Sequence, residues 1–194
     1  MSEETIINHY RVVADNINIG MIVYNNSSVA QVDLSISAVK ELARIPNIVG
    51  LKDCSGDLPK SERMVRELGD KIAVLNGNGE SWEPYSMLMG KVGLISGIAH
   101  FAPRLALELY RASEQGDFRK AVDIRKKISP FIDFYKDVSA TYDRSAQTVI
   151  NKEAQNLRGI PAGPPRLPLL PLSDDLRQKL AVILQEMGLS ELDL

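Results

Sequence analysis

The chain has 194 residues, of which 44% are hydrophobic and 25% are charged, and its formal net charge at pH 7 is −2. This composition is typical of a globular protein, and the length is sufficient to bury a sizeable core. Lysine and arginine form no long basic run along the chain, so the sequence offers no strongly basic surface for nucleic acid or an anionic membrane. We therefore expect neither as a partner.

Cysteine and histidine, the residue types that form disulfides or zinc sites, are sparse. Cys54 is the only cysteine, and His9 and His100 are too far apart in sequence to form a zinc-binding motif with it. The first residues lack the features of a signal peptide, and no apolar stretch approaches the about 20 residues of a membrane helix. We expect a cytoplasmic protein without a metal site.

The first part of the chain alternates helical and strand-like segments. Ser2 is a good N-cap for an opening helix, and the apolar run 19–24 predicts a strand that is buried on both faces because it lacks polar alternation. Ser35 is the expected cap of a second helix. The apolar run 48–51 then predicts a second strand, which ends at Lys52.

The same alternation continues to residue 96. Segments 59–68 and 81–89 have helical patterns, whereas segments 72–75 and 92–96 are short apolar runs that predict strands. Strands that recur at such short intervals, with a helix between each pair, are typical of βα units with tight loops. The pattern therefore predicts a parallel sheet.

The remainder of the chain is predicted to be helical. Pro103 begins one helix, segment 117–136 predicts another with a bend at Pro130, and segment 145–158 predicts a third. The pattern changes from alternating to purely helical near residue 112. We therefore divide the chain into residues 1–112 and a helical extension, residues 113–194.

The helical extension contains a proline-rich segment, 159–171, with five prolines. Proline lacks the amide hydrogen that a helix needs, so this segment is expected to be extended. Ser173 is the predicted cap of a last helix, and Gly188 is expected to end it.

Four βα units fit two architectures. They form either a complete small doubly wound domain or half of an eight-stranded barrel, and a chain that opens with a helix favours the half-barrel. The loop 76–80 resembles a phosphate-binding loop but lacks the third glycine of a dinucleotide fingerprint, since Trp82 stands there. A nucleotide-binding domain is therefore disfavoured.

Lys52 and Tyr24 stand at the carboxyl ends of neighbouring predicted strands, where parallel α/β proteins carry out their chemistry. Desolvation there favours the neutral amine of a lysine, which attacks carbonyl groups to form a Schiff base, and a nearby tyrosine can relay protons. From spacing alone, a lysine extending to solvent and a packing tyrosine remain alternatives. Cys54 is interpreted as a packing residue.

Four segments, in this order and spacing, resemble the dihydrodipicolinate synthase/N-acetylneuraminate lyase family. They are Tyr24-Asn25, the specific run Gly50-Leu51-Lys52-Asp53-Cys54-Ser55-Gly56-Asp57, Asn76-Gly77 and Gly93-Leu94-Ile95-Ser96. The proline-rich run before the last helix also resembles the family. The resemblance covers essentially the whole chain, but only the carboxyl-terminal portion of the family.

The resemblance implies a class I pyruvate-type aldolase or dehydratase with an α/β fold, the TIM (β/α)₈ barrel. This chain would supply strands 5–8 and the helical extension. Lys52 falls on the imine-forming lysine, and Tyr24 falls on the proton-relaying tyrosine. Ile95 falls on a residue whose backbone carbonyl faces the imine, while Glu80 and Gly97 fall where relatives line the substrate tail. The implied substrate is pyruvate or another 2-oxo acid, no separate cofactor is implied, and family members are usually tetramers.

The sequence departs from the family in two places. Segment 26–30 lacks the proline and arginine that follow the tyrosine in the synthases, which favours a lyase or dehydratase of a sugar-derived 2-oxo acid. The family's first four strands have no counterpart, so we expect a truncated chain that is weak or inactive alone. Such a chain would form a homo-oligomer or pair with a complementing N-terminal half-barrel. A non-catalytic assembly or regulatory subunit is the alternative.

Overall fold

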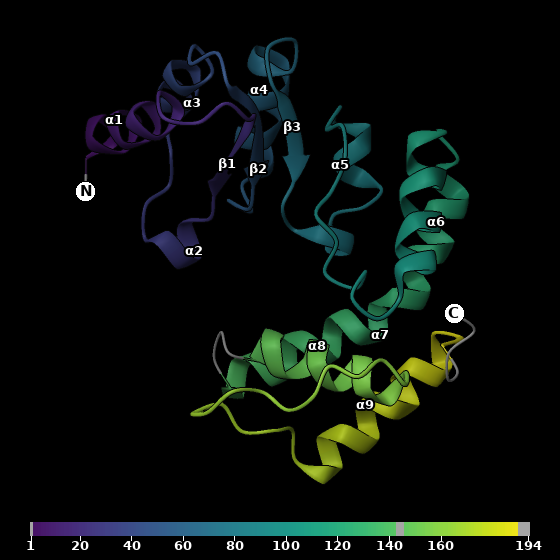
Figure 1. Ribbon diagram of the computed structural model, residues 1–194. Helices are drawn as coiled ribbons and strands as arrows, with labels where there is room; N and C mark the ends of the chain where they lie inside the picture. The colour runs from purple at the N-terminus through teal and green to yellow at the C-terminus, as the bar shows by residue number, and fades with distance from the viewer. Residues whose placement is uncertain (1, 143–145, 190–194) are drawn as a thin grey trace. The chain divides into compact units, whose positions relative to one another are not determined.

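The computed structural model describes residues 2–142 and 146–189 (Figure 1). Contacts within the chain divide it into two compact units, Met1–Ser96 and Gly97–Leu194. The first contains a parallel sheet with helices, and the second contains helices and connecting segments. Within the described ranges, no helix is long and apolar enough to cross a membrane.

The described part of the first unit has a three-stranded parallel sheet in the order β1-β2-β3 (Figure 1). The strands are β1 (Met21–Asn25), β2 (Ile48–Asp53) and β3 (Ala73–Asn76). The helical elements are α1 (Glu3–Ala14), α2 (Ser27–Ala30), α3 (Ile36–Leu42), α4 (Leu58–Leu68), the 3₁₀ turn η1 (Gly79–Ser81) and α5 (Tyr85–Leu88). The predicted parallel arrangement is confirmed for these strands.

Local capping explains where two of these helices begin. The Ser2 hydroxyl accepts a hydrogen bond from the Thr5 amide at the start of α1, and the Ser35 hydroxyl accepts one from the Ala38 amide at the start of α3. Each bond satisfies an amide that has no partner within its helix. Both predicted caps are therefore confirmed.

The two faces of the sheet differ in burial. On the covered face, Val23 and Leu51 are buried in a core shared with α1, α3 and α4. On the other face, which we call the open face, Ile22 is 50% and Tyr24 is 48% exposed. The prediction that the first strand is buried on both faces is wrong, because the helices of this unit contribute their apolar residues to a core on one side of the sheet.

Residues 81–89 do not form the single helix that their pattern predicts. The turn η1 ends at Ser81, and α5 spans only Tyr85–Leu88. Pro84 stands between them, and a proline has no amide hydrogen to continue a helix. The segment therefore folds as two short pieces.

The predicted strand 92–96 is reduced to an isolated parallel bridge between Asn76 and Leu94. Backbone hydrogen bonds still join this segment to the sheet, from the Val92 amide to the Val74 carbonyl (3.1 Å) and from the Ile95 amide to the Asn76 carbonyl (2.9 Å). Because β3 is only four residues long, the ladder ends after a few bonds. The segment lies beside β3, as predicted, without becoming a regular strand.

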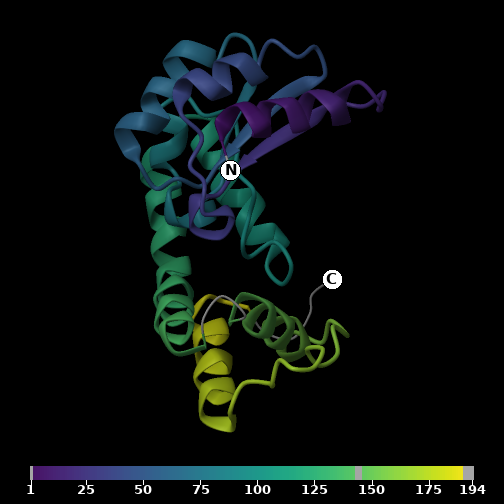
Figure 2. The same cartoon turned by 90° about the vertical axis from the view of Figure 1, so that its left-hand side faces the viewer.

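The second unit is built from α6 (Pro103–Glu114), α7 (Phe118–Tyr142), α8 (Ala146–Leu157) and α9 (Asp174–Glu186). Figure 2 shows α9 beside α7 and α8, and all four helices contribute to one hydrophobic core. The sequence division at residue 112 differs from the division by contacts at residue 96. The reason is that Leu105 and Leu109 of α6 are buried in this helical core.

Two other expectations for the second unit have different outcomes. Helix α7 continues to Tyr142 through Pro130, beyond the predicted end at residue 136, and the buried Phe131, Ile132 and Phe134 beyond the proline hold it against the core. The proline-rich segment has neither helix nor strand, as predicted, and Lys152 of α8 donates to its Ala162 carbonyl (2.5 Å).

Candidate active site

Tyr24 and Lys52 are direct partners in the parallel ladder between β1 and β2. Residues alternate between the two faces of a strand, so both side chains lie on the open face. The ammonium nitrogen of Lys52 lies 3.9 Å from the centre of the Tyr24 ring, a cation–π contact. The predicted proximity of these two side chains is confirmed.

The Tyr24 hydroxyl is held by the segment that follows its strand. Asn26 Nδ2 donates to the Tyr24 Oη over 2.9 Å, and Asn26 Oδ1 accepts from the Ser28 hydroxyl over 2.8 Å. Ser28 belongs to the short helix α2, which therefore supports the position of Asn26. The hydroxyl therefore accepts from Asn26, and its hydrogen bond with Cys54 acts to lower the pKa of that thiol.

The ends of β2 and β3 approach each other closely at Gly77, which directly follows β3. Its amide donates to the Asp53 carbonyl over 2.9 Å, and the Cys54 thiol donates to the Gly77 carbonyl over 3.0 Å. A Cβ atom at Gly77 would lie 2.2 Å from the Cys54 sulfur and 2.8 Å from the Asp53 carbonyl oxygen. Only glycine permits this approach, which explains the Asn76-Gly77 pair at the strand end.

The thiol of Cys54 is not a strong nucleophile here. Burial raises the pKa of Cys54 above its ordinary value, and this effect outweighs the opposing influence of Tyr24 and Lys52. A thiol is less reactive than a thiolate. The structure is therefore consistent with the packing role predicted for Cys54.

A buried polar network lies directly behind the Lys52–Tyr24 pair, on the covered face. Asn25 Nδ2 donates to Asp53 Oδ1 (3.2 Å), joining β1 to β2, and Lys91 Nζ donates to Asp53 Oδ2 (3.4 Å). The Ser61 hydroxyl of α4 also donates to Asp53 Oδ2. The side chains of Asp53 and Lys91 are both 0% exposed.

The two charged groups of this network influence one another. Burial raises the pKa of Asp53, but the Ser61 hydrogen bond and the positive charge of Lys91 outweigh it and hold that pKa below its ordinary value. Burial lowers the pKa of Lys91, and the charge of Asp53 opposes that change only in part. Asp53 is therefore an ionised carboxylate in the folded chain.

Sequence reasoning missed this network. Lys91 stands between a glycine and an apolar run, where a lysine is ordinarily solvated, and nothing in the local pattern indicates burial. One feature of the sequence does point to the network. Each candidate catalytic residue is followed directly by a polar residue, Tyr24 by Asn25 and Lys52 by Asp53. Alternation places such neighbours together on the opposite face.

The remaining candidate residues lie in different surroundings. Ile95 is 46% exposed and its amide is bonded to the end of β3, whereas Glu80 is only 4% exposed and accepts a hydrogen bond from the Ser96 hydroxyl. Gly97 is the first residue of the second unit and is partly buried. In the described part of the chain, no three His, Cys, Asp or Glu side chains are grouped to hold a metal ion.

Comparison with known proteins agrees with this geometry. The family model of the Dihydrodipicolinate synthetase family matches residues 1–187. A curated 4-hydroxy-tetrahydrodipicolinate synthase from Archaeoglobus fulgidus is 33% identical over 187 residues, which cover 96% of this chain and 62% of that protein. The chain thus spans less than two thirds of that relative's length.

Solved structures give the same result. Dihydrodipicolinate synthase from Aquifex aeolicus is 27% identical with a TM-score of 0.87, over 98% of this chain and 63% of that one. The chloride-inhibited dihydrodipicolinate synthase from Acinetobacter baumannii, solved in complex with pyruvate, is 30% identical with a TM-score of 0.85, over 97% of this chain and 62% of that one. The predicted TIM-barrel α/β fold class is confirmed, and the chain belongs to the dihydrodipicolinate synthetase family.

Proposed function

We propose that the chain carries the Schiff-base centre of a lyase that acts on pyruvate or a sugar-derived 2-oxo acid. The observation that carries this proposal is the contact between Lys52 and Tyr24 at the paired ends of β1 and β2. Family membership and the pyruvate complex of the Acinetobacter baumannii relative support the same chemistry. The fold alone would not, because TIM barrels host many reactions.

In this proposal, Lys52 is the nucleophile. Its neutral amine attacks the keto carbon of the 2-oxo acid, and loss of water leaves an imine between Nζ and that carbon. The positively charged imine accepts an electron pair from a bond at the neighbouring carbon, which gives an enamine. In aldol cleavage a carbon–carbon bond supplies this pair, and a proton then adds to the same carbon. In dehydration a carbon–hydrogen bond supplies the pair, and the hydroxyl on the following carbon then leaves with its own electron pair as water. Water then hydrolyses the imine, which releases the product and regenerates the lysine amine.

Tyr24 is proposed to move protons between the substrate and solvent. Its hydroxyl, which Asn26 helps to position, would donate its proton to the substrate, and the deprotonated oxygen would then take a proton back. The Ile95 carbonyl is proposed to face the imine, and Glu80 and Gly97 are proposed to line the substrate tail. Glu80 is almost fully buried, so we propose that a polar group on the tail of the substrate reaches in and forms a hydrogen bond with its carboxylate.

The substrate class follows from the segment after Tyr24. Residues 26–30 contain no arginine to bind a second carboxylate, and Asn26 is engaged with the tyrosine hydroxyl. A polyhydroxylated 2-oxo acid needs hydrogen-bonding partners rather than a second cation. We therefore favour a reaction of a sugar-derived 2-oxo acid over the synthesis that gives those relatives their name.

The open face bears on the activity of the chain by itself. Ile22, Tyr24 and Ile95 are each about half exposed, and an apolar surface at a reactive lysine favours coverage by other protein. We propose that β1 to β3 and segment 92–96 correspond to barrel strands 5–8. A second copy or a complementing N-terminal half-barrel would close this face. Without that closure, substrate orientation is poor and activity is weak.

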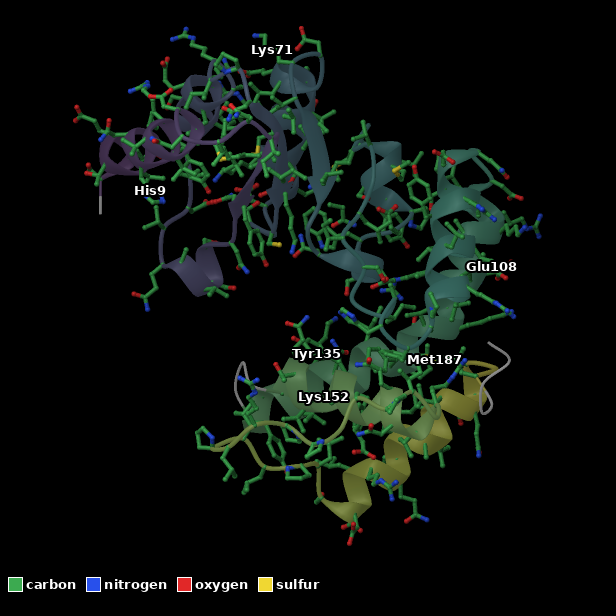
Figure 3. The ribbon with its side chains drawn as sticks, in the orientation of Figure 1. His9, Lys71, Glu108, Tyr135, Lys152 and Met187 are labelled. Atoms are coloured by element: carbon green, nitrogen blue, oxygen red, sulfur yellow. The ribbon has the colours of Figure 1, made fainter. Side chains whose placement is uncertain are left out.

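The same exposure favours one alternative, a non-catalytic half-barrel that serves as an assembly or regulatory subunit. The two functions are separated by trapping with pyruvate and borohydride, followed by intact mass spectrometry. The lyase proposal predicts a mass gain of one carboxyethyl group that disappears in Lys52→Ala and persists in Lys71→Ala, a control at an exposed lysine. Figure 3 labels Lys71, which precedes β3 at the end of that strand opposite Asn76. A folded chain that gains no mass is evidence for the alternative.

A further inference from the structure

The relative position of Lys52 and Tyr24 depends on more than the contact between their two side chains. Both stand on the open face, where no described hydrogen bond links one to the other across the two strands. A cation–π contact of this kind contributes modestly at an exposed site and is tolerant of direction. Asn26 holds the Tyr24 hydroxyl, but the distance between the two side chains still depends on how β1 and β2 are placed against each other.

The covered face supplies a directional link at the same level of the sheet. Asn25 and Asp53 are the next ladder partners after Tyr24 and Lys52, and the Asn25 amide donates to the Asp53 carboxylate. Asn25 Nδ2 also donates to Asp33 (3.0 Å), and its Oδ1 accepts from the Leu34 amide (3.1 Å). A slip of one residue between β1 and β2 would break this arrangement and turn one member of the Lys52–Tyr24 pair away from the other.

Asp53 is in turn fixed from three other directions. The Ser55 amide donates to Oδ1 (3.1 Å), and the Ser61 hydroxyl and Lys91 Nζ both donate to Oδ2. Lys91 Nζ also lies 3.3 Å from the Ser61 hydroxyl and 5.3 Å from the centre of the Trp82 ring. Both oxygens of the carboxylate are therefore held, which leaves it little freedom to turn.

A buried ion pair of this kind is a poor source of net stability. The cost of removing two charges from water consumes most of their attraction, and apolar residues of similar size often stabilise a core equally well. The charges add directional hydrogen bonds, because each oxygen of the carboxylate accepts from defined donors. The pair Asp53–Lys91 is thus better suited to fixing a geometry than to holding the core together.

We propose that the buried network of Asn25, Asp53 and Lys91 is a positioning device that holds Lys52 against Tyr24. Lys91 holds the Asp53 carboxylate, Asp53 accepts from Asn25, and this bond fixes β2 against β1 at the level of the reactive pair. All three residues are positioning residues, since none lies on the open face. The catalytic importance of the device rests on the proposed function, but its effect on the Lys52–Tyr24 contact does not.

The test measures that contact without any 2-oxo acid. Reductive methylation with formaldehyde and cyanoborohydride labels lysines, and peptide mass spectrometry gives the rate at Lys52 relative to Lys71. Because the Tyr24 ring covers part of the ammonium group, Tyr24→Leu should raise this relative rate about two- to fivefold. We call this fold-change, the relative rate with Tyr24→Leu divided by the relative rate without it, the coupling between the two residues. The coupling is then measured in variants of the buried network.

The decisive variant is Lys91→Met, which removes the positive charge at similar side-chain length. The coupling is expected to fall to about onefold in Lys91→Met and to return in Asp53→Asn/Lys91→Met, whose amide oxygen still accepts from Asn25 without a buried charge. Lys40→Met, which removes a surface lysine paired with Glu67, should leave the coupling unchanged. Unchanged coupling in folded Lys91→Met overturns the proposal, and so does lost coupling in the folded double variant.

Thermal unfolding of each variant shows which comparison applies. If Lys91→Met does not fold, the coupling is measured in Asp53→Asn/Lys91→Met and in the same variant with Asn25→Leu added. The proposal predicts coupling in the first and none in the second. Coupling that survives Asn25→Leu contradicts the proposal. A chain that shows the coupling but forms no pyruvate adduct retains the positioning device and loses the proposed lyase function, so the two failures are distinguishable.

Discussion

The ammonium nitrogen of Lys52 lies 3.9 Å from the ring centre of Tyr24, its direct partner across two parallel strands. The contact places the Lys52 amine over the ring of a tyrosine whose hydroxyl accepts from Asn26. A 2-oxo acid bound to Lys52 would therefore have a proton donor next to its reacting carbons.

The Tyr24 hydroxyl is expected to matter for proton transfer and little for imine formation. Tyr24→Phe keeps the ring beside Lys52 and removes only the oxygen that Asn26 contacts. Exchange of the pyruvate methyl protons with deuterated water, followed by NMR, should slow about 100-fold in this variant. The yield of the borohydride-trapped adduct should change little. Exchange at the unmodified rate would exclude Tyr24 as the proton relay.

Gly77 is expected to be intolerant of any side chain. In Gly77→Ala the new Cβ would meet the Asp53 carbonyl oxygen at 2.8 Å as well as the Cys54 sulfur. We expect a loss of about 2 kcal/mol in the free energy of unfolding, measured with urea. Adding Cys54→Ala removes the sulfur but not the backbone contact, so it should restore only part of the loss. Full restoration would show that the strand ends are not held by the backbone.

Stability at acid pH is expected to depend on Asp53. Its pKa in the folded chain lies below the ordinary value of 3.8, so the unfolded chain binds a proton first as the pH falls. The stabilisation is complete above pH 3.8 and is lost as the pH drops through the folded pKa. Asp53→Asn should therefore flatten the acid side of a plot of unfolding free energy against pH.

A surface carboxylate provides the control for that measurement. Hydrogen bonds from Arg63 and Lys40 lower the pKa of Glu67 to about 2, and its side chain, 18% exposed, still reaches solvent. Added salt should screen the Glu67 contribution and leave the buried Asp53 contribution largely intact. If Asp53→Asn and Glu67→Gln show the same sensitivity to salt, the buried pair does not behave as described.

The open face is expected to drive association of the chain. Ile22 is half exposed on this face, and an apolar face of this kind favours contact with other protein. Sedimentation velocity should show concentration-dependent association that Ile22→Asp weakens at least tenfold. Val12→Asp, at an exposed position on α1, is the control and should behave as the unmodified chain. A chain that remains monomeric at all concentrations would contradict this expectation.

Local signals explain what the sequence could predict. The caps at Ser2, Ser35 and Ser173 depend on bonds within three residues, so they are visible in the sequence and present in the structure. The Lys52–Tyr24 pairing follows from the rule that parallel strands end at the same edge of a sheet. Each of these inferences needs only neighbouring residues or one topological rule.

The expectations that failed depend on contacts distant in sequence. The exposure of Ile22 reflects which face of the sheet the helices cover, and the burial of Lys91 reflects a carboxylate that is far from it in sequence. Helix α7 continues through Pro130 because buried aromatic residues beyond the proline hold it, a contribution that intrinsic helix propensity does not contain. These features are tertiary, and the local pattern gives no sign of them.

The most direct test of the account is to locate the adduct after the chain is incubated with pyruvate and borohydride. Tandem mass spectrometry of the digested protein identifies which lysine carries the carboxyethyl group. The account predicts that Lys52 carries it, while exposed lysines such as Lys71 remain unmodified at the same pyruvate concentration. Modification spread over surface lysines in proportion to their exposure, with none enriched at Lys52, would contradict the account.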